Sequence, residues 1–151
     1  MTPSAWHDDA PKDAGHDKMQ ADFVRYYRGK IGGATMKVTY EKDPTDVPLS
    51  RVIAEFPISA PGNRGIIAFA DVALRYDNGY PAAFRFVELK PRIRTVGGLV
   101  RQCRAIEYAA GSGGLREAEV IACVFDDDPK LDLLRELYPH VWTMPARLRA
   151  E

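Results

Sequence analysis

The sequence predicts a single α/β domain in which a mixed central β-sheet has helices on both faces. Its length of 151 residues fits one domain. Two stretches of β-type residues, 65–76 and 82–90, are separated by a turn-forming segment and predict an antiparallel hairpin. Beyond residue 94, helical and strand patterns alternate, as they do when parallel strands are joined by helices.

The first part of the chain predicts an arm followed by a helix. Residues 1–17 are rich in Asp, Pro, His and Ala without an apolar period, so we expect a flexible N-terminal arm before a domain of residues 18–151. His7 and His16 fall in this arm among aspartates, which indicates a solvated tail, with weak metal binding as the alternative. From Asp17 to about Lys30 the apolar residues recur at helical spacing and predict a helix.

The next fifty residues predict strands. Residues 36–41 fit a short strand, and residues 43–46 have the composition of a turn. Residues 51–59 fit both a helix and alternation, but Pro57 disfavours a helix at the residue before it. We therefore predict a strand there.

The predicted hairpin carries the most informative charges. Asp71 lies in the middle of an apolar strand, and Glu88 and Lys90 end the following one. With an even-numbered loop, Asp71 and Glu88 share a face of the sheet, either directly opposite or one diagonal step apart. A buried aspartate is costly unless it is paired or bound to a metal. The structural alternative for Glu88 and Lys90 is an ion pair at a strand edge.

Residues 95–110 predict a helix with two distinct faces. An apolar stripe should pack on the core, whereas Arg101, Arg104 and Tyr108 share another face. That face could contact a backbone phosphate and a base or sugar. A solvated surface on which Arg packs against Tyr is the alternative. The stripe consists of Leu99, Cys103, Ile106 and Ala110.

The last third of the chain predicts strand, helix and strand. Residues 118–125 are almost continuously apolar, as in a strand covered on both faces. We expect Asp128 to cap a helix opened by Pro129. Residues 140–144 fit a last strand.

Composition limits the function without assigning it. The net charge is zero, so only local charge could attract nucleic acid. Cys103 and Cys123 have apolar neighbours and no metal-ligand spacing, which predicts reduced core residues. No segment approaches the length of a membrane span and the N-terminus lacks a signal-peptide run, so we expect a cytoplasmic protein without a membrane partner.

Between residues 51 and 144 the chain resembles the PD-(D/E)XK nuclease superfamily. The resemblance depends on Asp71, on Glu88-Leu89-Lys90 as an E-x-K motif, and on the following helix with Gln102. Members share a restriction-endonuclease-like fold with an acid on the second core strand and E-x-K or D-x-K on the third. Asp128-Pro129-Lys130 also fits D-x-K, but it precedes a helix and is better explained as a cap.

Two positions depart from the family pattern. Ala70 precedes Asp71, so the proline of the family's name is missing. Many members carry a further acid on the first helix, for which Glu55 and Asp22 are the candidates here.

The resemblance implies Mg²⁺-dependent hydrolysis of phosphodiester bonds, with Mn²⁺ as a substitute. Asp71, Glu88 and the backbone carbonyl of Leu89 would hold the metal, with Glu55 as a further candidate ligand. Lys90 would orient or deprotonate the attacking water or stabilise the phosphate, and Gln102 would position water or phosphate. DNA is favoured over RNA, and an endonuclease over an exonuclease. The nucleic-acid-binding residues would be Arg92, Arg94, Arg101, Arg104 and Tyr108.

Two other classes of function stay open. A binding module could use the basic helix to hold nucleic acid without cutting it. Such a module should bind in EDTA and should lose little affinity on Asp71→Ala. An accessory subunit of a repair, transposition or phage-defence assembly would bind nucleic acid weakly on its own. A homodimer or a larger protein assembly is compatible with each class.

Overall fold

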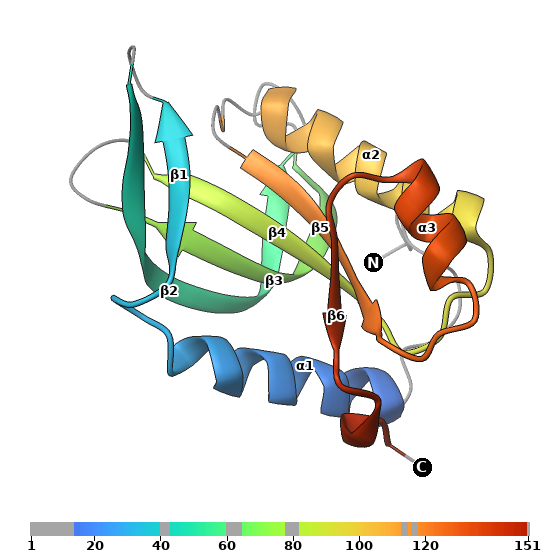
Figure 1. Cartoon of the computed structure of the whole chain (residues 1–151). Helices are drawn as coiled ribbons and strands as arrows, with labels where there is room; N and C mark the ends of the chain where they lie inside the picture. The colour runs from blue at the N-terminus through green and yellow to red at the C-terminus, as the bar shows by residue number, and fades with distance from the viewer. Residues whose placement is uncertain are drawn as a thin grey trace.

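Six strands form one curled, mixed sheet in the order β1-β2-β3-β4-β5-β6 (Figure 1). The computed structural model describes residues 14–39, 43–59, 65–77, 82–112, 115 and 118–150. Strands β1 to β4 pair antiparallel, whereas β4, β5 and β6 run parallel. The strands are β1 Thr35–Thr39, β2 Pro44–Ser59, β3 Ile66–Tyr76, β4 Ala83–Lys90, β5 Ala118–Phe125 and β6 Val141–Met144.

Helices cover both faces of the sheet. Helix α1 (Ala14–Arg28) packs on one face, and α2 (Val96–Ser112) and α3 (Leu131–Leu137) pack on the other, with a 3₁₀ turn, η1 (Ala146–Leu148), near the end of the chain (Figure 1). This arrangement confirms the predicted α/β class with a mixed sheet. Within the described ranges, no helix is long and apolar enough to cross a membrane.

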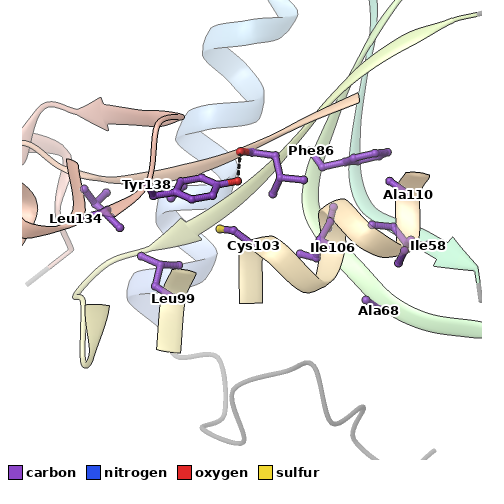
Figure 2. Packing of buried hydrophobic residues seen from close by; sticks show 14 of the residues in the cluster. Ile58, Ala68, Phe86, Leu99, Cys103, Ile106, Ala110, Leu134 and Tyr138 are labelled. Atoms are coloured by element: carbon purple, nitrogen blue, oxygen red, sulfur yellow. Dashed lines mark hydrogen bonds between the residues drawn. The ribbon is translucent and has the colours of Figure 1, made fainter. Parts of the chain in front are cut away.

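Each face of the sheet has its own hydrophobic core. On the α2 side, Phe86 packs with Cys103 and Ile106, and the hydroxyl of Tyr138 donates to the carbonyl of Val120 at 2.7 Å (Figure 2). On the α1 side, the buried residues of α1 pack with buried residues of all six strands. The predicted stripe of α2 is buried throughout, and both cysteines are free and buried, as predicted.

Strands β2 and β3 change the face that they present to each helix layer. Val72 and Leu74 pack on the α1 side, but Ala70 packs on the α2 side, although residues two apart in a regular strand share a face. The switch occurs where the pairing steps from Ala54↔Val72 to Phe56↔Ala70. Between these pairs lie Asp71 on β3 and Glu55 on β2, and Glu55 has a positive φ.

Several element boundaries differ from the predictions. Helix α1 begins at Ala14, so the last residues assigned to the arm are helical, and residues 1–13 lie outside the described part. The turn predicted at 43–46 is wrong, because Pro44 already pairs with Thr39 at the start of β2. The strand predicted at 51–59 is confirmed as the second half of β2.

Candidate functional site

Asp71 marks the point where β3 and β4 separate. Among the described residues, the ladder between these strands runs from Tyr76↔Ala83 to Val72↔Val87 and goes no further. Continued by one residue, this register places Asp71 opposite Glu88, which is one of the two arrangements that the sequence predicted. The Leu89 N–H donates to Asp71 Oδ2 at 2.8 Å, so a side-chain carboxylate replaces the next ladder bond. Asp71 is 3% exposed and Glu88 2%.

Glu88 connects the end of β4 to α2. Its Oε2 accepts a hydrogen bond of 3.0 Å from Gln102 Nε2, which places the predicted glutamine at the acid. Lys90 lies two residues further along β4 and is half-buried. Burial raises the pKa of the Cys103 thiol on α2, with Glu88 adding to the rise and Lys90 opposing it. Both charges of the E-x-K motif therefore act on the α2 side of the sheet.

His16 approaches Asp71 from α1. Its Nε2 lies 3.2 Å from Asp71 Oδ1, and both side chains are below a tenth exposed. The expectation that His16 belongs to a solvated tail is wrong, because α1 begins before it and turns its ring onto the sheet. The Asp71 carboxylate thus contacts β4 with one oxygen and α1 with the other.

Gln20, one turn after His16, joins the site to β2. Its Nε2 donates to the backbone carbonyl of Asp71 at 2.8 Å and to Glu55 Oε1 at 3.1 Å. The β2–β3 register brings Glu55 level with Asp71, so the three acids lie in a row across β2, β3 and β4. Glu55 has φ of 52°, a left-handed conformation that costs a non-glycine residue roughly 1–2 kcal/mol. Asp22, the other candidate acid, instead pairs with Lys18 and Arg25.

The candidate nucleic-acid-binding residues are on the surface. Arg101, Arg104 and Tyr108 are exposed on α2, Tyr108 at 70%, and Arg92 and Arg94 are exposed in the segment after β4. The Arg104 guanidinium lies 5.0 Å from the centre of the Tyr138 ring and pairs with Glu107 at 3.2 Å. The structure therefore agrees with the predicted exposed face of α2 while giving Arg104 a structural role as well.

Asp128, in the second D-x-K sequence, has a structural role different from the predicted cap. The residue that precedes α3 is Lys130, which makes no side-chain capping bond. Asp128 Oδ1 accepts from the Lys130 N–H at 2.9 Å, and Oδ2 accepts from the Ile93 N–H at 3.0 Å. Both carboxylate oxygens of Asp128 thus accept from backbone N–H groups in loops, whereas Glu88 Oε2 accepts from a side chain of α2.

The donor atoms at Asp71 and Glu88 suit a hard divalent cation. Within the described residues, no group of three or more His, Cys, Asp or Glu side chains is arranged to hold a metal ion. Two buried carboxylates on neighbouring strands are nevertheless a sufficient protein contribution for Mg²⁺, which commonly uses one or two carboxylates and keeps waters or substrate phosphate. The donor types therefore match those of the metal that the resemblance implies, although the Asp71 carboxylate contacts His16 of α1 and the Glu88 carboxylate contacts Gln102 of α2.

Sequence reasoning missed His16 and Gln20. A signal was present, because His16, Met19, Gln20 and Phe23 follow one another at helical spacing. Extending the predicted helix by one turn would have placed His16 and Gln20 on the side of α1 that carries Met19 and Phe23.

Comparisons of the chain with protein-family models, with curated proteins and with solved structures found no match.

Proposed function

We propose that this protein is a divalent-metal-dependent nuclease of the PD-(D/E)XK type with a restriction-endonuclease-like fold. The observation that carries the proposal is the hydrogen bond from the Leu89 N–H, inside the E-x-K sequence, to the carboxylate of Asp71. It joins two sequence features that are 18 residues apart at a split between strands. After α1 and β1, the order of antiparallel strands β2 to β4, helix α2 and parallel strand β5 also agrees with that fold.

The proposed roles of the residues are those that the resemblance implies. Asp71 and Glu88, with the carbonyl of Leu89, would hold Mg²⁺ or Mn²⁺, and Glu55 is the candidate further acid. When bound, the metal would polarise the phosphate and acidify a water. Lys90 would orient a water or neutralise charge on the phosphate.

Two neighbouring side chains would position the acids. Gln102 donates to one oxygen of Glu88, which restricts the rotation of that carboxylate. His16 Nε2 lies 3.2 Å from the Asp71 oxygen that does not contact Leu89, so its ring would limit the movement of that carboxylate. Such contacts keep acidic groups in one orientation before substrate arrives.

The substrate in this proposal is nucleic acid, with DNA favoured over RNA and internal cleavage over end cleavage. Arg92, Arg94, Arg101 and Arg104 would contact phosphates, and Tyr108 is exposed enough to stack on a base. A cytoplasmic location and a homodimer or larger assembly complete the proposal.

The experiment is a cleavage assay on single-stranded, duplex and branched DNA and RNA with Mg²⁺ or Mn²⁺. Wild type is compared with Glu88→Gln and Lys90→Met, and Lys130→Met serves as a matched control because Lys130 ends the other D-x-K sequence. We expect metal-dependent cleavage that falls by at least about a hundredfold in both site variants and persists in Lys130→Met. Cleavage by folded Glu88→Gln at the wild-type rate would refute the assignment.

A second candidate function is nucleic-acid binding without cleavage, which the exposed Arg101 and Tyr108 on α2 favour. This function predicts binding in EDTA that is unaffected by Glu88→Gln but weakened by Arg101→Gln. Measuring binding of a labelled oligonucleotide beside the cleavage assay separates the two functions.

A further inference from the structure

A cavity of about 560 Å³ lies beside β6, and neither Asp71 nor Glu88 lines it. It is lined by residues of the second half of α1, by β6, by Arg135 of α3 and by residues of η1. The contacts with Asp71 come instead from His16 and Gln20 in the first half of α1. The volume lies within the range of about 300–1,000 Å³ that is usual for small-molecule sites.

Aromatic rings form one wall of this cavity. Tyr27 stacks on Trp142 with ring centroids 5.6 Å apart and planes 14° from parallel. Phe23 lies 6.4 Å from Trp142, and Tyr26 meets Tyr27 edge-on while remaining 59% exposed. Burial raises the pKa of Tyr27 to about 12, so its hydroxyl stays neutral and able to donate at physiological pH. Such a wall suits a flat, partly apolar ligand.

The charge on the lining is positive. Arg135 and Arg147 both line the cavity, and neither guanidinium has an ion-pair partner within the described part of the chain. Asp22, the acid in the lining, is already neutralised by Lys18 at 2.7 Å and Arg25 at 3.0 Å. Two unpaired guanidinium groups beside aromatic rings suit an anion, and guanidinium matches phosphate well.

An added strand from another protein fits this edge less well. β6 is an edge strand of only four residues, and Pro139 and Pro145 stand close to its two ends. Short edge strands and prolines are features that prevent pairing with a further strand. The lining therefore favours a small planar anion over an extended peptide.

We propose that this cavity binds a nucleotide, with the base against the aromatic wall and the phosphate at Arg135 and Arg147. A free mononucleotide and the end of a single strand share this chemistry, and the experiment distinguishes them. The proposal does not depend on the nuclease activity, since Asp71, Glu88 and Glu55 are not among the residues that line the cavity.

Tryptophan fluorescence provides a direct readout. The chain has two tryptophans, so Trp6→Phe leaves Trp142 as the only tryptophan, which is excited selectively at wavelengths that tyrosine does not absorb. In this background we would titrate AMP, adenosine, inorganic phosphate and a 5′-phosphorylated tetranucleotide into the protein in EDTA. Arg135→Gln and Arg147→Gln remove the expected phosphate contacts, and Arg51→Gln, an exposed arginine outside the lining, is the charge-matched control.

We expect AMP to quench Trp142 saturably, with a dissociation constant about tenfold weaker in either lining variant and unchanged in Arg51→Gln. Glu88→Gln should bind AMP like wild type, which separates this cavity from the nuclease site. Much tighter binding of the tetranucleotide than of AMP would identify the end of a single strand as the ligand. Equal binding of the two would identify a free mononucleotide as the ligand.

Three results would overturn the proposal. The first is no saturable quenching by AMP or the tetranucleotide at millimolar concentration, or quenching that the lining variants do not weaken. The second is inorganic phosphate or adenosine alone binding as tightly as AMP. The third is a Trp142 signal that changes with protein concentration together with the sedimentation coefficient, because a second copy would then fill the cavity.

Discussion

Removing the Asp71 carboxylate should destabilise the fold through its contacts, and comparing Ala with Asn at this position isolates them. Asp71→Ala removes the acceptor of the Leu89 N–H at 2.8 Å and the oxygen 3.2 Å from His16 Nε2. Asp71→Asn removes the same negative charge but keeps an oxygen that can accept from Leu89. The cost of burying the charge therefore cancels in the comparison.

A buried donor left without an acceptor costs about 1–3 kcal/mol. We therefore expect Asp71→Asn to be more stable than Asp71→Ala by about 2 kcal/mol, or roughly 4–8 °C in Tm for a chain of this size. Urea unfolding in EDTA, followed by circular dichroism, measures the difference in the free energy of unfolding. An alanine variant as stable as the asparagine variant, at equal m values, would show that the bond to Leu89 does not stabilise the strand split.

Three further predictions concern the two cores. Burial raises the pKa of Cys123 from 9.0 to about 12 and that of Tyr27 from 10.0 to about 12. As the pH rises, the unfolded chain therefore loses these protons before the folded protein does. The free energy of unfolding should fall from about pH 9 upward, by about 1.4 kcal/mol per pH unit for Cys123. Urea midpoints that stay constant to pH 11 would contradict this prediction. Cys103 and Cys123 should not react with a thiol reagent in the native protein and should both react in urea, whereas fast native labelling would disagree with their burial. Tyr138→Phe should cost about 1 kcal/mol in urea unfolding, because it removes the donor to the Val120 carbonyl, and an unchanged midpoint would count against that bond.

The sequence predicted the parts of the fold that local patterns determine. The β4 segment has a strand period and ends in Glu88 and Lys90, so the placement of these two charges on one face follows from alternation alone. The stripe from Leu99 to Ala110 predicted the buried face of α2 for the same reason. With α2 oriented in this way, Gln102 reaches Glu88, whereas the role of Gln102 in positioning water or phosphate stays a prediction.

Other features depend on tertiary contacts. The burial of His16 results from the position of α1 on the sheet, which residues far along the chain determine. The positive φ of Glu55 accompanies the change of face in β2 and β3, and no turn-forming residue in the sequence marks it. Pro44 could be read as part of a turn because proline is frequent there, although it also begins strands near an edge.

The measurement that tests the central claim most directly is Mn²⁺ binding, followed by electron paramagnetic resonance of the free ion. The claim is that Asp71 and Glu88 together hold a divalent cation. Asp71→Asn and Glu88→Gln each remove one carboxylate, and Asp46→Asn is the control, since Asp46 is an exposed acid paired with Lys37 on β1. We predict one site in wild type and in Asp46→Asn that weakens at least about tenfold in each of the other variants. Equal Mn²⁺ binding by wild type and folded Glu88→Gln would contradict the account.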